Sequence, residues 1–196
     1  AALLIAHQEK RINQTFPNCL SPTIPIEEVP LKIHDDHLYH GSALIQIAEH
    51  PQFTAINALK LGKRLLRVAY RINDDIAVYF KYARKPTSAY KEYLFTFTKE
   101  HLAELSQIAN AIPKTFIALV CVKDREICCL AQAELLRLLA RREKALGAPE
   151  ENLTVLVTVP AQKSLRVYVN TPGKKGSMLG KAFIVSRSAF PEVIFA

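Results

Sequence analysis

A lysine- and glycine-rich stretch near the carboxyl end holds the residues best suited to bind phosphate. Residues 171–181 contain Lys174, Lys175 and Lys181 together with three glycines. Glycine lets a backbone approach an anion closely, and lysine supplies the opposite charge. The stretch is not a Walker A loop, because Ala182 follows the Gly-Lys pair where that motif has Ser or Thr. We expect a contact with a polyanion, or else a flexible hairpin turn.

Basic residues are concentrated in two parts of the chain. Residues 60–91 hold nine lysines and arginines against two acidic residues, and residues 152–196 hold six against one. Clustering of this kind is typical of proteins that neutralise nucleic-acid phosphates. The candidate contacts to DNA or RNA are Lys60, Lys63, Arg64, Arg67, Arg71, Arg84, Lys85, Lys174, Lys175 and Lys181. The alternative is that these charges lie on the solvated faces of strands and helices.

Tyrosines accompany one of the basic segments. Tyr82, Tyr90 and Tyr93 lie close in sequence to Arg84 and Lys85. Aromatic rings that stack on unpaired bases are the second component of a single-strand binding site. Tyrosine is also a common strand residue, so the same rings fit the surface of a sheet.

Two further clusters contain residue types that bind metals. His34, His37 and His40 lie within seven residues that also include two aspartates. We interpret this segment as a loop that enters a helix, with its histidines on the surface, and a transition-metal site as the alternative.

Three cysteines lie in apolar runs, where a free thiol packs as a small hydrophobic group. A two-residue turn at Asp124 and Arg125 would place Cys121 opposite Cys128 on a neighbouring strand, with Cys129 beside it.

The composition is that of a globular protein. The chain has 196 residues, is 49% apolar and 22% charged, and carries a net charge of +8, which excludes an acidic disordered protein. No apolar run approaches the roughly 20 residues of a membrane span, and no basic segment precedes the first apolar residues. We therefore expect a cytoplasmic protein without a membrane partner.

The N-terminal region differs from the rest. Residues 1–12 have helical spacing, and four prolines follow between Pro17 and Pro30. We expect residues 1–30 to form a helix and a proline-rich arm, and residues 31–196 to form a single α/β domain.

Local patterns predict the elements that position these residues. Three helices are predicted, over 43–60, 99–112 and 132–146. Ser42 is the N-cap of the first, which has a kink at Pro51, and Thr98 is the N-cap of the second. Gly147 ends the third. Predicted strands cover 65–72, 76–83, 93–97, 116–122, 127–130, 153–159, 165–170 and 182–187. The order α-βββ-α-ββ-α-βββ indicates an α/β or α+β fold, with a central mixed sheet and helices packed on it.

The order helix, three strands, helix, strand over residues 43–122 resembles the PD-(D/E)XK nuclease superfamily. In that family a carboxylate and a Glu-x-Lys motif hold a divalent cation that activates water. The nearest match here is Tyr79-Phe80-Lys81, in which Tyr79 stands at the glutamate position. The resemblance implies Asp74, Asp75 and Lys81 as catalytic residues, with Asp75 as a ligand of Mg²⁺ and Glu49 as a further carboxylate.

The chain is also similar to short bacterial proteins of unassigned function. The shared segments are Phe80-Lys81-Tyr82, Phe95-Thr96-Phe97, residues 116–121 and residues 127–130. This similarity implies a bacterial source and no particular chemistry.

Three hypotheses follow from the sequence. The first is a bacterial cytoplasmic protein with a nuclease-like fold that binds nucleic acid. The second is an interaction subunit that docks on a protein partner through residues 1–30. The third is a metal-dependent nuclease that uses Asp74, Asp75 and Lys81.

Overall fold

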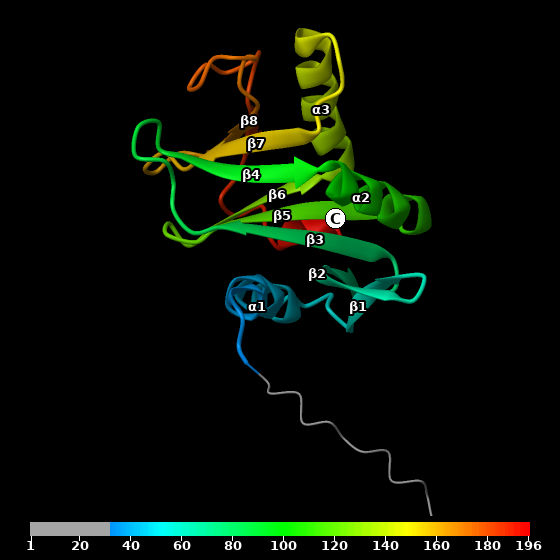
Figure 1. Ribbon diagram of the computed structural model, residues 1–196. Coiled ribbons are helices and arrows are strands. Elements are labelled where there is room, and N and C mark those ends of the chain that lie inside the picture. Colours follow the sequence, from blue (N-terminus) through cyan, green and yellow to red (C-terminus); the bar gives the residue numbers. More distant parts are fainter. Residues whose placement is uncertain (1–31) are drawn as a thin grey trace, which may run out of the picture. The chain divides into compact units, whose positions relative to one another are not determined.

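A computed structural model describes residues 32–196, which form an α/β structure with four helices and nine strands (Figure 1). The helices are α1 (Asp35–Ala48), α2 (Lys99–Ala111), α3 (Gln132–Leu146) and α4 (Glu192–Phe195). The strands are β1 (Ile56–Leu61), β2 (Arg64–Ile72), β3 (Ile76–Ala83), β4 (Glu92–Thr98), β5 (Lys114–Cys121), β6 (Glu126–Ala131), β7 (Asn152–Thr158), β8 (Leu165–Tyr168) and β9 (Phe183–Val185). The predicted helix and arm over residues 1–30 lie outside the described residues.

The strands form two sheets. Sheet A has the order β1-β2-β3-β5-β6, and sheet B has the order β4-β7-β8-β9. Neighbouring strands are antiparallel except β3 and β5, which are parallel over their whole length, from Ile76 opposite Lys114 to Ala83 opposite Cys121. A parallel pair needs a crossover connection, and here β4 and α2 form it.

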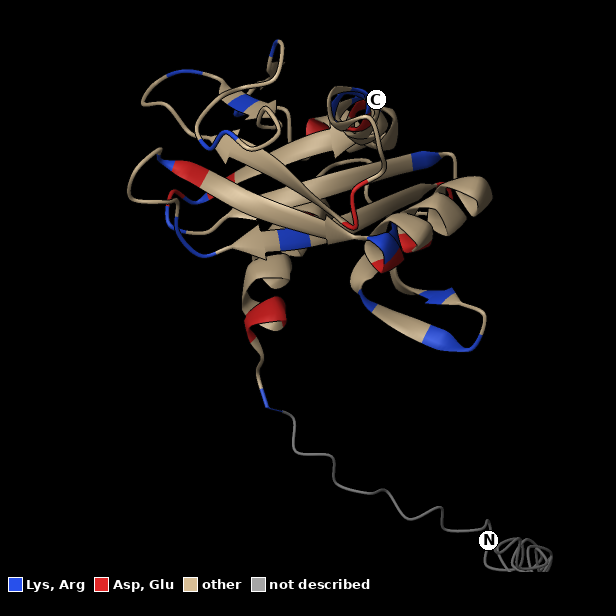
Figure 2. Ribbon diagram, turned by 45° about the horizontal axis from the view of Figure 1, so that its top comes forward, with Lys and Arg blue, Asp and Glu red and all other residues tan. Residues whose placement is uncertain are grey.

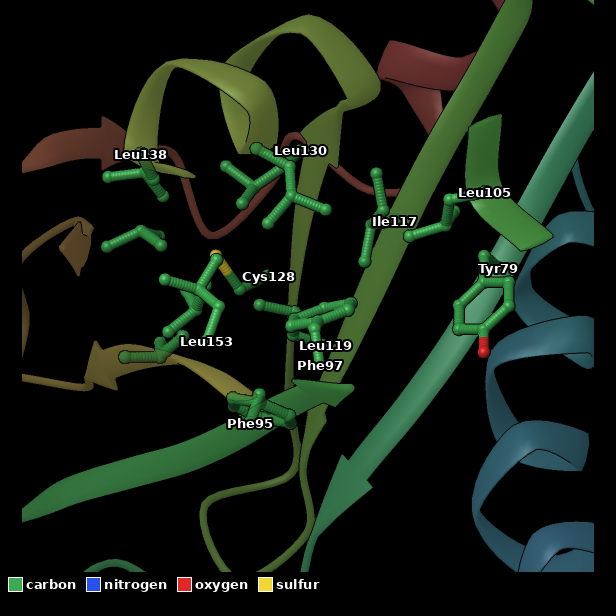
Figure 3. Close-up of a cluster of buried hydrophobic side chains, with 14 of the residues drawn as sticks. Tyr79, Phe95, Phe97, Leu105, Ile117, Leu119, Cys128, Leu130, Leu138 and Leu153 are labelled. Atoms are coloured by element: carbon green, nitrogen blue, oxygen red, sulfur yellow. The ribbon is translucent and has the colours of Figure 1, made fainter. Parts of the chain in front are cut away.

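The main core lies between the two sheets. Tyr93, Phe95 and Phe97 alternate along β4 and point toward sheet A, where they meet residues such as Leu119 of β5. Leucines of α2 and α3 close the ends of this core, as the labelled side chains in Figure 3 show. The opposite face of β4 is left for solvent or a ligand.

A second core covers the other face of sheet A. Ala43 and Ile47 of α1 and Ile194 of α4 pack there against Val78 and Phe80 of β3. In Figure 1, α1 lies on the side of sheet A away from sheet B. Strand β3 is thus buried on both faces.

The helix predicted over residues 43–60 is wrong at both ends. Helix α1 begins eight residues earlier, at Asp35, so the histidine-rich segment is largely helical rather than a loop. Ser42 is not the N-cap: it lies inside the helix, where its hydroxyl donates to the Tyr39 carbonyl at 2.9 Å. Beyond α1, Pro51 has no N–H to continue a helix, and residues 56–61 instead pair with β2 as a strand. The three-residue spacing of Phe53, Ile56 and Leu59 suggested a helix, but cross-strand pairing outweighs it.

The other predicted helices and strands are present with small shifts of their ends. In α2 the Thr98 hydroxyl accepts from the His101 N–H, as a capped helix requires. Helix α3 ends at Gly147, which has a φ of 80°. Within the part of the chain described here, no helix has the length and apolar character needed to cross a membrane.

The predicted pairing of Cys121 with Cys128 is wrong by two residues. Cys121 lies opposite Glu126, and Cys128 lies opposite Leu119, because a four-residue turn joins β5 and β6. Cys121, Cys128 and Cys129 are buried free thiols, and burial raises the pKa of each. They act as packing groups in the two cores.

The prediction that the histidines of the histidine-rich segment lie on the surface is correct for His34 and His37 but wrong for His40. His40 is 2% exposed, stacks on Phe80 with ring centroids 5.4 Å apart, and has no partner for either ring nitrogen among residues 32–196. Burial lowers its pKa below 6.5; the charges of Lys81 and His37 act in the same direction, and Asp36 opposes them.

We predict that His40→Leu raises the free energy of unfolding at pH 7.5 by about 1 kcal/mol, because an unpartnered polar ring is replaced by an apolar group. The unfolded chain binds a proton on His40 at a higher pH than the folded chain does. The free energy of unfolding of the natural chain is therefore undiminished above about pH 6.5 and decreases as the pH falls below that value. Leucine at position 40 binds no proton, so the advantage of the variant grows as the pH falls. Urea unfolding at pH 7.5 and 5.5 measures how much free energy of unfolding each chain loses between these pH values. The loss should be smaller for His40→Leu than for the natural chain or for His37→Leu, an exposed control on the same helix. An equal loss in all three chains would contradict this assignment.

Candidate nucleic-acid interface

The loops that leave β3 and β5 lie side by side at one edge of sheet A. The Val122 N–H donates to the Ala83 carbonyl at 3.0 Å, and the Lys123 N–H donates to the Arg84 carbonyl at 3.1 Å. Parallel pairing of β3 with β5 causes this, since both strands end at the same edge.

Sheet B contributes to the same edge through two side-chain contacts. The Tyr93 hydroxyl donates to the Asp124 carboxylate at 2.8 Å and accepts from the Asp124 N–H at 3.1 Å, which joins the start of β4 to the β5–β6 turn. Arg187 pairs with Glu126 and donates to the carbonyls of Pro160 and Lys163, at 2.6 Å and 2.9 Å. The loops 84–91, 122–125 and 159–164 are thus held together.

These loops carry a group of exposed cations, here called the basic edge: Lys85, Lys91, Lys123, Arg125 and Lys163. None of the five forms a salt bridge within residues 32–196, whereas the neighbouring Arg84 pairs with Asp35. Figure 2 shows lysines and arginines on several loops at this side of the sheets. The charge of the basic edge is free to attract an anion.

A pocket of about 550 Å³ adjoins the basic edge on the outer face of sheet B. Its floor includes Leu94 of β4 with Thr154 and Leu156 of β7, which point away from the main core. Its walls come from loop 84–91, including Tyr90, and from residues 170–175. The volume is within the usual range for sites that bind small molecules.

Two consecutive arginines of α3 bind residues 170–181, the first part of which forms one wall of the pocket. Arg142 donates to the Asn170 carbonyl at the start of this stretch. Arg141 donates to the Leu179 and Lys181 carbonyls at its end, at 3.3 Å and 2.5 Å. The stretch is therefore held to α3 at both ends.

The acidic groups of the pocket wall are already paired. Glu150 binds Arg142 through two contacts of 2.7 Å, and the 4% exposed Glu92 accepts from the Tyr168 hydroxyl at 2.5 Å. Burial, together with the contact to Glu92, raises the pKa of Tyr168 and keeps its phenol protonated.

Lys174 and Lys175, by contrast, form no salt bridge with any residue in the described range. The rim of the pocket is therefore net positive.

Tyr90 presents an aromatic ring at the pocket. It is 50% exposed, and Gly176 packs so closely against it that an added Cβ would come within 2.3 Å of Cε1. One side of the ring is thus supported by backbone, and much of its remaining surface is open for stacking.

The structure separates the basic residues named from sequence. Lys174 and Lys175 line the pocket, Lys85 belongs to the basic edge, and Lys181 is exposed but does not line the pocket. The remaining group lies on the β1–β2 hairpin, which Figures 1 and 2 place at the opposite end of the molecule from residues 170–181. There Lys60, Lys63, Arg67 and Arg71 are exposed, and Arg64 pairs with Glu104 of α2.

The candidate nuclease residues do not share one site. Asp74 and Asp75 are exposed in the β2–β3 turn, and Asp75 pairs with Lys114 at 3.7 Å. Lys81 lies six residues further along β3, which in an extended strand is a separation of about 20 Å. Residues 32–196 contain no group of three or more histidines, cysteines or acidic residues that would hold a metal ion.

Sequence reasoning missed most of the basic edge. The predicted binding segment from Lys81 to Lys91 includes Lys85 and Lys91, but Lys123, Arg125 and Lys163 lie in other short turns, where no local cluster marks them. Their common position depends on strand order. Of the three tyrosines considered for stacking, Tyr93 is fully buried and Tyr82 packs on Tyr39 with centroids 4.8 Å apart, which leaves Tyr90.

Comparisons with protein-family models, with curated proteins and with solved structures gave no match.

We predict that Gly176→Ala destabilises the chain by about 1 kcal/mol more than Gly173→Ala. Both glycines have a φ near +70°, so both substitutions carry the same backbone strain, but nothing lies within 4 Å of a Cβ at position 173. Chemical unfolding of the two variants measures the difference. In the Tyr90→Ala background the difference should vanish, and its persistence there would show that the Tyr90 contact is not its cause.

Proposed function

We propose that this protein binds single-stranded nucleic acid at the basic edge and the adjoining pocket. The observation that carries the proposal is the pocket on sheet B, where an open tyrosine ring lies beside two unpaired lysines. The setting we propose is the bacterial cytoplasm, where single-stranded RNA and DNA intermediates occur.

Phosphates would bind the cations of the basic edge and the pocket rim. Each phosphate that a lysine or arginine neutralises releases condensed counterions, so affinity falls with salt concentration. Lys174 and Lys175 would contact the phosphates of the nucleotide in the pocket, and the basic edge would follow the strand beyond it. The cations of the basic edge lie on several separate loops, so they favour the extended backbone of a nucleic-acid strand over a compact ligand.

A base would stack on Tyr90. The pocket has room for a nucleoside-sized group, and its apolar floor at Leu94 and Leu156 suits a flat ring. A base inside a duplex has both faces covered by its neighbours, so this contact favours unpaired strands. Because stacking is available to every base, we expect little sequence preference.

The β1–β2 hairpin has no equivalent arrangement. Its cations are exposed, but residues 60–71 do not contribute to the pocket. We propose that it adds at most nonspecific attraction, which makes it a matched control for the pocket lysines.

We predict that Lys174→Ala with Lys175→Ala weakens binding of a short oligothymidylate roughly tenfold at moderate salt and reduces the slope of log K against log salt concentration by about 1.4. Lys60→Ala with Lys63→Ala removes the same charge from the hairpin and should change affinity by less than about threefold. Fluorescence anisotropy at several salt concentrations gives both quantities.

Tyr90→Ala should cost about 1–3 kcal/mol of binding free energy, with Tyr90→Phe close to the natural chain.

If the two lysine pairs reduce the affinity equally when they are replaced, binding depends on net charge alone and not on the pocket. Absence of binding at low salt would overturn the proposal and favour the alternative of a protein partner that binds residues 1–30.

A further inference from the structure

A second group of reactive side chains lies between β3 and α2, outside the pocket lining. Lys81 of β3 extends toward the first turn of α2, where its Nζ lies 3.4 Å from Nδ1 of His101. Both side chains are only partly buried, so solvent and small solutes reach them. The proposed binding of nucleic acid makes no use of either residue.

The hydrogen bonds of His101 define its protonation. The Thr98 N–H donates to Nδ1 at 3.2 Å, and a backbone N–H only donates. Nδ1 therefore carries no proton, and the imidazole is neutral with its hydrogen on Nε2. Burial, assisted by the charge of Lys81, lowers the pKa of His101 and maintains this form. Lys81 thus faces an acceptor without a negative charge.

No carboxylate compensates Lys81 within residues 32–196. Glu104 of α2 is engaged by Arg64 and by the Tyr79 hydroxyl, the latter at 3.2 Å, and Glu100 lies fully exposed on the same helix. His40 of α1 lies on the other face of β3, where it stacks on Phe80, and the charge of Lys81 lowers its pKa.

Besides the acceptor Nδ1 of His101, the Phe97 ring favours the cation, since its centroid lies 5.2 Å from Nζ. Burial lowers the pKa of Lys81, so the neutral amine is more populated than in a fully solvated lysine.

We propose that Lys81 is a nucleophilic amine that condenses with small aldehydes. The lone pair of the neutral Nζ attacks the carbonyl carbon, a C–N bond forms, and the C=O π electrons move to oxygen. Nδ1 of His101 takes one proton from Nζ and passes it to this oxygen, which becomes a hydroxyl group, and then passes the second Nζ proton to the same hydroxyl group. That group leaves as water, and an imine remains on Lys81. The step needs no oxidant or reductant and is independent of nucleic-acid binding.

The test treats the full chain with glycolaldehyde and sodium cyanoborohydride, which reduces the imine to a stable amine that peptide mass spectrometry locates. Lys85, exposed in the loop after β3, is the internal control. At pH 7 we expect Lys81 to react at least about fivefold faster than Lys85, since more of it is neutral. The ratio should shrink toward pH 10, where exposed lysines also lose their proton. Equal rates at pH 7, or a ratio that does not change with pH, would overturn the proposal.

Two variants of His101 separate its role as proton acceptor from its role in the helix cap. His101→Asn places an amide oxygen near the position of Nδ1, where it can accept the Thr98 N–H and keep the cap but cannot take a proton, so the reactivity of Lys81 should fall to the level of Lys85. His101→Phe removes the acceptor and should reduce that reactivity to the level of Lys85. Thermal unfolding checks that both variants fold. If the phenylalanine variant folds and Lys81 keeps its full rate, His101 takes no part and the proposed proton transfer is wrong.

Discussion

The parallel pairing of β3 with β5 is the constraint on which the rest of the structure depends. Two parallel neighbours require the chain to return to its starting end between them, and here β4 and α2 make that return. Since the places beside β3 in sheet A are taken by β2 and β5, β4 pairs with β7 and begins a second sheet. The main core forms between the sheets, and the loops after β3 and β5 are brought to one edge, next to the open face of β4.

Much of the fold is predictable because its signals are local. Thr98 marks the start of α2, Gly147 marks the end of α3, and the Asn73–Asp75 turn separates two strand-like runs. Residues 56–61 are different, because their apolar spacing suits a helix and only the partner strand β2 makes them a strand. The division into two sheets likewise depends on pairing between β4 and β7, which lie more than fifty residues apart in the sequence.

The candidate site was predictable only in part, for the same reason. The composition of residues 171–181 identifies Lys174 and Lys175, and the neighbourhood of Arg84 draws attention to Tyr90. Arg141 and Arg142 look like ordinary surface residues of a helix, yet they hold both ends of the lysine-bearing stretch. The basic edge gathers single residues from three turns, so it emerges only once the strand order is known. Clusters in sequence are therefore a poor guide to clusters in space here, as the separate β1–β2 hairpin shows.

The most direct test of the account is to map where a single strand touches the molecule. Two-dimensional NMR spectra of the ¹⁵N-labelled full chain, titrated with a short oligothymidylate, report this residue by residue. We predict shift changes in the loops 84–91, 122–125 and 159–164 and in residues 171–176, with the β1–β2 hairpin nearly unaffected. Shift changes confined to the hairpin would contradict the proposed binding site. The absence of any shift change at low salt, even at a high concentration of the oligothymidylate, would also contradict it.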